Sequence, residues 1–242
     1  MKFAAFSGRV SKEILRDPVT LSFGLGFPLI LLFLLSAIQA NIPVDLFEIK
    51  SLTPGITVFG LSFITLFSAT LIAKDRESAL TERLFTTPLT AADFIFGYAV
   101  PILPISIMQC VICYIAAAFL GLKLTVTVIW AVVFIIPVAV FFIALGLLFG
   151  SILTVKQAGG ICGALVTNLT AWLSGVWFDL DLVGGAFKKI AYMLPFVHAV
   201  ELERAVLNGD YGSITLHIWW VAGYAFAALA AAVLVFLMRM KK

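Results

Sequence analysis

Few side chains in the sequence are of the types that perform covalent or metal chemistry. Cys110 and Cys113 form a C-x-x-C pattern, but they lie in an apolar run without a neighbouring base that would favour a reactive thiolate. We interpret them as small residues of a packed helix, and the odd number of cysteines, three, argues against a disulfide framework. His198 and His217 are far apart in the sequence, with no recognisable set of metal ligands around them. The sequence therefore predicts no catalytic residue and no metal site.

One charged segment connects two apolar runs and has the composition of a short helix. It reads KDRESALTERLFTTPLTAAD over residues 74–93. Asp75 is suited to cap a helix, good helix formers follow it, and Pro88 ends the stretch. We expect a helix that carries Glu82 and Arg83 and stays close to the membrane, because apolar runs flank it. The same residues would equally suit an ordinary solvated loop.

A second polar connection, residues 179–213, contains two apolar stretches that are each too short to cross a membrane. These stretches, 186–194 and 196–207, are divided by Pro195, which breaks a helix. We therefore expect two short helices that form a re-entrant or interfacial hairpin. Backbone of this kind is tolerated at membrane depth only where protein or a water-filled cavity covers it.

The same connection carries a group of charged residues. Glu201 and Arg204 are three residues apart and could pair on one helix. A membrane enzyme, such as an acyl- or phosphotransferase, would use Asp179, Asp181, His198 or Glu201 at this face. That alternative requires the polar residues to meet around a cavity.

The composition is that of an integral membrane protein. Of the 242 residues, 62% are hydrophobic and 12% are charged, and the mean hydropathy is +1.13. Soluble domains have about 45–50% apolar and about 25% charged residues. The composition therefore excludes a water-soluble enzyme, a disordered chain and a disulfide scaffold. The net charge of +3 is too small to indicate nucleic-acid binding.

Six apolar runs approach or exceed the roughly 20 residues that a membrane-spanning helix requires. We place them near 19–40, 54–73, 94–119, 127–153, 158–178 and 214–238. An even number of spans puts both termini on one side, and with the termini inside, eleven of the sixteen basic residues also lie inside. The sequence thus predicts an all-α, multi-pass protein of the plasma (inner) membrane with both termini in the cytoplasm. The 74–93 connection is then inner and the 179–213 connection outer.

Residues 1–18 precede these runs and have the pattern of an amphipathic helix. Apolar residues recur at helical spacing on one face: Phe3, Phe6, Val10 and Ile14. Arg9 and Glu13 can pair one turn apart, and Asp17-Pro18 ends the helix. We expect the helix to lie in the membrane interface with its basic side chains toward anionic headgroups.

The apolar runs contain almost no ionisable residue near their centres. Proton- and ion-coupled carriers place costly charged side chains there, so the pattern disfavours a carrier. Uphill transport would require energy from a partner that docks on the cytoplasmic side. Gly146 with Gly150, and Gly159 with Gly163, have the small-residue spacing that allows close helix packing.

Taken in order along the chain, these features resemble the permeases of ABC-2-type ABC transporters. In that family the first inner loop commonly has an acidic residue, Arg and Glu, followed by Glu-Arg-Leu and Thr-Pro. The matching residues here are Asp75, Arg76, Glu77, Glu82, Arg83, Leu84, Thr87 and Pro88. The family's outer motif is matched by Leu194, Pro195, Glu201, Arg204 and Gly209. The resemblance covers essentially the whole chain.

The resemblance implies a half-size permease of a bacterial ABC exporter, with one transmembrane domain over residues 1–242. Its parts would be an interfacial helix (1–18), spans one to five (19–178), an outer re-entrant hairpin (179–213) and the last span with a basic tail (214–242). The permease would pair with a second permease, expected to be a copy of the same chain, and with two copies of a separate ABC ATPase. ATP and Mg²⁺ would bind that ATPase, and this chain would bind no cofactor.

The resemblance also assigns roles to residues. Contact with the ATPase would fall on a coupling helix and the leader helix, at Asp75, Arg76, Glu77, Thr81, Glu82, Arg83, Leu84 and Arg16. The outer re-entrant motif would consist of Pro195, Glu201 and Arg204. Closure of the ATPases would rock the permease halves and expel the substrate outward.

Among the cargoes that the resemblance implies, we expect an amphiphilic small molecule, a drug or a lipid. Aromatic residues of the second and fifth runs could line its path, although they would serve equally for packing or lipid contact: Phe59, Phe63, Phe67, Trp172 and Trp177. Export of a lipid-linked glycan or a peptide by the same machinery is an alternative. The residues also leave open an ATP-independent carrier, a membrane enzyme, and a membrane anchor or sensor that transports nothing.

Overall fold

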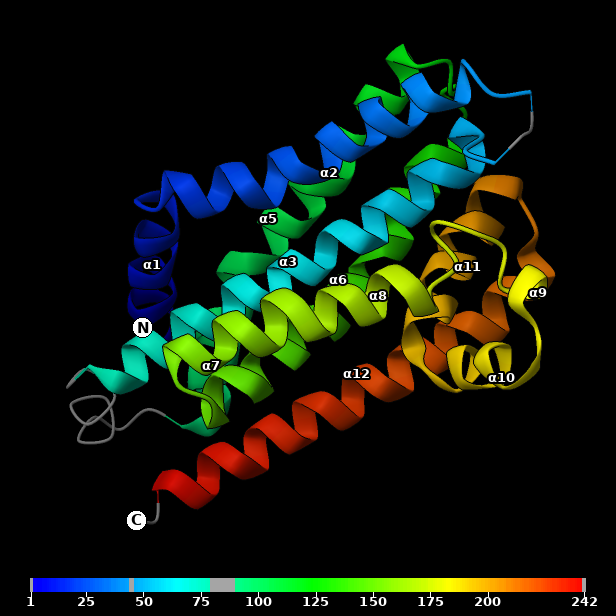
Figure 1. Cartoon of the computed structure of the whole chain (residues 1–242). Helices are drawn as coiled ribbons and strands as arrows, with labels where there is room; N and C mark the ends of the chain where they lie inside the picture. Colours follow the sequence, from blue (N-terminus) through cyan, green and yellow to red (C-terminus); the bar gives the residue numbers. More distant parts are fainter. Residues whose placement is uncertain (1, 44–45, 79–89, 241–242) are drawn as a thin grey trace.

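The computed structural model describes residues 2–43, 46–78 and 90–240, and this part of the chain is helical without a strand (Figure 1). Five of its helices are long and apolar enough to cross a membrane: α2 (Pro18–Gln39), α3 (Ile49–Glu77), α5 (Ala91–Phe119), α6 (Val126–Ile152) and α12 (Tyr211–Met240). Their positions confirm the all-α membrane fold and five of the predicted runs. Their outward faces carry many exposed large apolar side chains, which suits contact with lipid.

The remaining predicted run, 158–178, is divided among three consecutive elements. These are α7 (Val155–Gly160), the π-helix η1 (Ile161–Val166) and α8 (Thr167–Leu173). The residues at the junctions, such as Gly160 and Val166, keep right-handed helical dihedral angles, so the helical path is continuous. It ends earlier than predicted, because Gly175 adopts a left-handed conformation with φ of +73°.

Helix α3 lies at the centre of the bundle, and α6 packs along it at close range. Of the two predicted pairs of small residues, Gly146 and Gly150 explain the close contact between α3 and α6. A Cβ atom added at Gly146 would lie 2.4 Å from Ser68 Cβ, and one at Gly150 would lie 2.7 Å from the backbone oxygen of Ala69. Gly159, in contrast, faces open space.

The N-terminal helix α1 (Lys2–Leu15) has the predicted amphipathic pattern. Phe6, Val10 and Ile14 are buried, and α1 packs chiefly against α5. Phe6 lies over Gly97 and stacks on Phe94, with ring centroids 5.8 Å apart. Protein therefore covers much of the apolar face that the sequence analysis assigned to the membrane interface.

The predicted outer hairpin is present as α10 (Gly185–Met193) and α11 (Pro195–Asn208), which meet at Pro195 as expected. A further short helix, α9 (Leu180–Val183), precedes them. In Figure 1, α9, α10 and α11 gather at one end of the bundle, while α1 and the ends of α3 and α12 lie at the other. The two charged connections of the sequence thus belong to opposite ends of the molecule.

Replacing Gly150 with alanine tests the close contact between α3 and α6. The added methyl group meets backbone atoms that cannot move away freely, so we expect the free energy of unfolding to fall by about 1–3 kcal/mol. Thermal unfolding of the detergent-solubilised chain measures the change. Gly159→Ala is the matched control, since its methyl group enters open space; equal stability of the two variants would contradict the packing.

Candidate functional site

The charged residues Asp75, Arg76 and Glu77 form the last turn of α3, which ends at Glu77. The expectation that Asp75 caps a new helix is therefore wrong: the spanning helix continues through the charged residues. It can do so because each of the three side chains has a polar partner on another helix or turn. Thr81, Glu82, Arg83 and Leu84 lie outside the described residues, as does the rest of the predicted loop helix.

Asp75 connects three helices at this inner end. Its carboxylate is 3% exposed and accepts two hydrogen bonds from the Arg9 guanidinium of α1, at 2.8 and 2.7 Å. The Tyr98 hydroxyl of α5 donates a third, at 2.6 Å. Arg9 also pairs with Glu13 at 2.6 Å, as the spacing predicted. The hydrogen bond to Asp75 raises the pKa of Arg9 above its ordinary value.

Arg76 and Glu77 connect the end of α3 to the turn between α6 and α7. The Arg76 guanidinium donates to the backbone oxygens of Ser151 and Leu153, where the carbonyl groups at the end of α6 have no helical partner. Glu77 accepts a hydrogen bond from the Val155 backbone N–H at 2.9 Å. The last turn of α3, which precedes residues 79–89, is thus held by contacts with α1, α5 and the α6–α7 turn.

Arg16, the remaining residue of the predicted coupling set, lies between α1 and α2. It is exposed and lines a cavity with Lys12 and Lys74. The same cavity is lined by Arg9, which binds Asp75, so Arg16 lies close to the end of α3.

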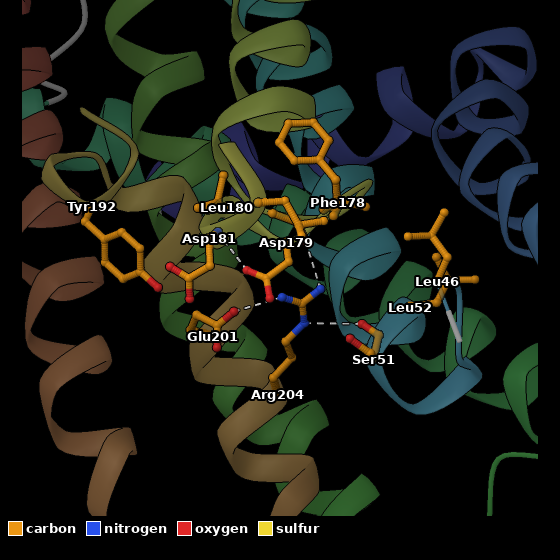
Figure 2. Close-up of a pocket in the computed structure, with 13 residues that line it drawn as sticks. Leu46, Ser51, Leu52, Phe178, Asp179, Leu180, Asp181, Tyr192, Glu201 and Arg204 are labelled. Carbon is orange, nitrogen blue, oxygen red and sulfur yellow. Dashed lines mark hydrogen bonds and ion pairs between the residues drawn. The ribbon is translucent and has the colours of Figure 1, made fainter. Parts of the chain in front are cut away.

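A cavity of about 530 Å³ opens at the opposite end of the bundle, beside α9, α10 and α11, and it brings together the charged residues of the 179–213 connection (Figure 2). Arg204 of α11 donates to Glu201 at 2.8 Å, which confirms the predicted pair. The same guanidinium donates to the backbone oxygens of Gly175 at 2.9 Å and Ser51 at 3.4 Å. Arg204 therefore ties the hairpin to the end of α8 and to α3. Pro195, at the start of α11, sets the direction of the helix that carries both charges.

Acidic and aromatic side chains complete the wall of this outer cavity. Asp179 caps α9 by accepting the Asp181 N–H at 2.9 Å, and Asp181 pairs with Lys188. The hydrogen bond to Asp181 raises the pKa of Lys188, and burial raises the pKa of Tyr192. The cavity thus has the polar lining that the membrane-enzyme alternative requires, but His198 is not among its lining residues.

The predicted aromatic path is only partly assembled. Phe59 lies 5.7 Å from Phe63 and 5.5 Å from Trp177, measured between ring centroids, and Phe59 and Phe67 are buried. Trp172 is 54% exposed on α8 and contacts Phe178 instead. Phe59, Phe63 and Trp177 therefore form an internal aromatic row. Trp172 does not belong to it.

Two more polar contacts were not predicted from the sequence. Glu203 of α11 is fully buried, and one of its carboxylate oxygens accepts a hydrogen bond from Tyr114 of α5 at 3.1 Å. His198 and His217 meet with their Nδ1 atoms 2.9 Å apart. A signal for Glu203 existed, because it occupies the helical position between the apolar residues Val200 and Leu207. No signal in the sequence indicated the histidine pair.

Double substitution tests whether Asp75 and Arg9 act as one unit. We expect Arg9→Gln and Asp75→Asn each to lower the free energy of unfolding by about 2 kcal/mol, since each removes charged hydrogen bonds from a nearly buried group. The double variant should lose clearly less than the sum, as measured by chemical unfolding in detergent micelles. Additive losses would mean that the two side chains contribute independently.

Comparison with known proteins identifies relatives of this chain. The family model for the ABC-2 type transporter matches residues 1–208. "Putative transport permease ycf38" of Porphyra purpurea is 33% identical over 151 residues, which cover 58% of this chain and 52% of that protein. "Nodulation protein J" of Bradyrhizobium diazoefficiens is 26% identical over 232 residues, covering 93% and 85%. The chain thus spans only about half the length of the first relative, but most of the second. Since the family match extends over most of the sequence, this chain belongs to the ABC-2 type transporter family.

Proposed function

We propose that this chain is the transmembrane permease subunit of an ATP-driven exporter, powered by separate ATPase subunits. The observation that carries the proposal is the fixed inner end of α3. Asp75, Arg76 and Glu77 bind it to α1, α5 and the α6–α7 turn, directly before the 79–89 loop. A force applied to that loop would reach four helices through side chains that are already in contact.

The proposed topology has six spans with both termini in the cytoplasm. Five spans are the long helices, and residues 155–173 form the additional one, fifth in chain order. Their continuous helical path at 1.5 Å per residue is about 28 Å long, close to the roughly 30 Å of a hydrocarbon core. Eleven of sixteen basic residues then lie on the inner side. This orientation puts the 79–89 loop where a soluble ATPase could bind it.

The proposed assembly contains two permeases and two ATPases, with ATP and Mg²⁺ bound by the ATPases. Residues Thr81, Glu82, Arg83 and Leu84 would contact the ATPase, with Asp75, Arg76 and Glu77 behind them and Arg16 at the side. The 242 residues include no G-x-x-x-x-G-K-[ST] phosphate loop, which supports hydrolysis by a partner. The second permease would be a copy of this chain.

The proposed cargo is an amphiphilic small molecule, a drug or a lipid. The aromatic row of Phe59, Phe63 and Trp177 leads from the bundle interior toward the outer end, where Trp177 precedes the cavity wall at Phe178. An apolar row that ends at a charged cavity suits a molecule with an apolar body and a polar group. Lipid-linked glycans and peptides are the alternative cargo.

One observation favours an ATP-independent carrier as the second candidate. Glu203 places a carboxyl group in the core of the bundle, against Tyr114, and coupled carriers use such groups to bind protons or ions. The inner-end contacts would have no role in such a carrier.

Substitutions in the inner loop test the coupling proposal. Glu82→Ala and Arg83→Ala should weaken attachment of the ATPase, or leave it attached while ATP hydrolysis no longer drives export. Co-purification with the tagged chain measures the first effect, and ATP hydrolysis compared with ATP-driven uptake of cargo into inverted vesicles measures the second. Lys123→Ala, in the opposite connection between α5 and α6, is the control. Unchanged attachment and unchanged coupling in both loop variants would remove the loop from the mechanism.

Loss of the Glu201–Arg204 pair should impair export but leave attachment of the ATPase unchanged. Arg204→Gln removes the hydrogen bonds that tie α11 to the ends of α3 and α8, so we expect reduced efflux of an exported dye with normal ATPase attachment. Lys189→Gln is the matched control, because Lys189 is exposed in the same hairpin and does not line the cavity. Detachment of the ATPase in a well-folded Arg204→Gln protein would refute the assignment of this end to the outside.

A further inference from the structure

A second cavity, of about 760 Å³, lies at the inner end where α1, α2 and α3 meet. Four basic side chains line it: Arg9, Lys12, Arg16 and Lys74. Two acidic residues, Glu13 and Asp17, also line it, so the wall carries an excess of positive charge. Arg9, Lys12 and Arg16 belong to α1 and the turn that follows it, and Lys74 of α3 joins them in the folded chain.

The excess charge is concentrated on Lys12 and Arg16. Arg9 is committed to Asp75 and Glu13, and the Lys74 ammonium lies 3.9 Å from a Glu13 oxygen. Asp17 is occupied as the cap of α2, where it accepts hydrogen bonds from the N–H and hydroxyl of Thr20. Lys12 and Arg16 are not buried, and no carboxylate in the described ranges lies within ion-pair distance of either.

The basic cavity continues into an apolar groove. Its own wall includes Ile14, Phe67 and Leu71, and a neighbouring cavity of about 400 Å³ shares Thr20 and Phe67 with it. This second cavity runs between α2 and α3 and is otherwise almost entirely apolar, lined by Val19, Leu21, Phe23, Gly24, Leu25, Phe63, Ile64, Leu66, Ile105 and Gly163. A basic surface is thus joined directly to an apolar groove.

Glycine at position 24 keeps the groove open. No heavy atom lies within 4 Å of the position that a Cβ atom would take at Gly24, so a side chain there would enter the groove without striking the protein. Gly26, on the same helix, also faces open space but does not line the groove. The two positions therefore form a natural pair of test and control.

We propose that this composite site binds an anionic glycerophospholipid of the membrane. Lys12 and Arg16 hold the phosphate in the basic cavity, and one acyl chain lies in the groove between α2 and α3. The chemistry is that of basic pockets between spanning helices, which bind acidic lipid headgroups on the cytoplasmic side. A free phosphate would use only the first cavity, and a second copy of the chain would use only the groove. This inference goes beyond the export function and concerns the permease without its ATPase.

The experiment measures lipid binding to the purified chain in detergent by native mass spectrometry, with dioleoyl phosphatidylglycerol, dioleoyl phosphatidylcholine and sn-glycerol 3-phosphate as probes. Phosphatidylglycerol should bind at least about tenfold more tightly than the other two. The double variant Lys12→Gln, Arg16→Gln should weaken that binding about thirtyfold, since each basic residue near a lipid surface contributes about one factor of five. Arg16→Lys keeps the charge and should retain most of the affinity.

The groove is tested with its matched pair of substitutions. Gly24→Leu should abolish the preference for phosphatidylglycerol over sn-glycerol 3-phosphate, whereas Gly26→Leu should leave it unchanged. Circular dichroism and unfolding temperature establish that each variant is folded.

Three outcomes would overturn the proposal. Equal affinity for phosphatidylglycerol and phosphatidylcholine would show that the basic residues do not select an anion. Equal affinity for sn-glycerol 3-phosphate would indicate a site for free phosphate. A Gly24→Leu protein that binds lipid normally but changes its monomer–dimer equilibrium would indicate that a second copy of the chain occupies the groove.

Discussion

The arrangement of the inner end depends on a carboxylate that is almost completely removed from water. Asp75 is stable there because Arg9 and Tyr98 supply hydrogen bonds and an opposite charge from two other helices. An unpaired carboxylate at this burial would cost several kcal/mol. The pairing explains why α1 folds back against α5, and why α3 can continue as a helix through charged residues into the inner loop. The contact of Asp75 with Arg9 and Tyr98 therefore both fixes the end of α3 in place and neutralises the carboxylate charge.

At the opposite end of the bundle, a partly buried charge is again satisfied by contacts with other elements, and here the charge is the Arg204 guanidinium. Arg204 satisfies backbone carbonyls of Gly175 and Ser51, at places where a helix ends or begins, and pairs with Glu201. The hairpin is thereby attached to the bundle through polar contacts, while its apolar residues, such as Val200, are buried in the core. Such an attachment leaves a polar cavity beside a closely packed bundle.

Helical periodicity and proline placement were sufficient to predict much of this fold. The amphipathic α1, the break at Pro195 and the Glu201–Arg204 pair depend on local spacing, and the structure confirms them. The role of Asp75 was misassigned because its partner Arg9 is 66 residues away, so nothing nearby indicates that the helix continues. Glu203 was not predicted to be buried because it lies in a polar connection outside the apolar runs. Its burial follows from its place on the inward face of α11. Cavities depend on how helices pack, and no single segment encodes them.

The central claim is that an ATPase made as a separate chain drives this permease from its inner end. The most direct measurement is purification of the tagged chain from its own membrane in a mild detergent, followed by mass spectrometry of the proteins that accompany it. The account predicts a soluble ATPase with a G-x-x-x-x-G-K-[ST] motif, present in equal amount to the permease. A chain that is purified intact and active in transport without any such partner would contradict the account and favour the carrier that Glu203 suggests.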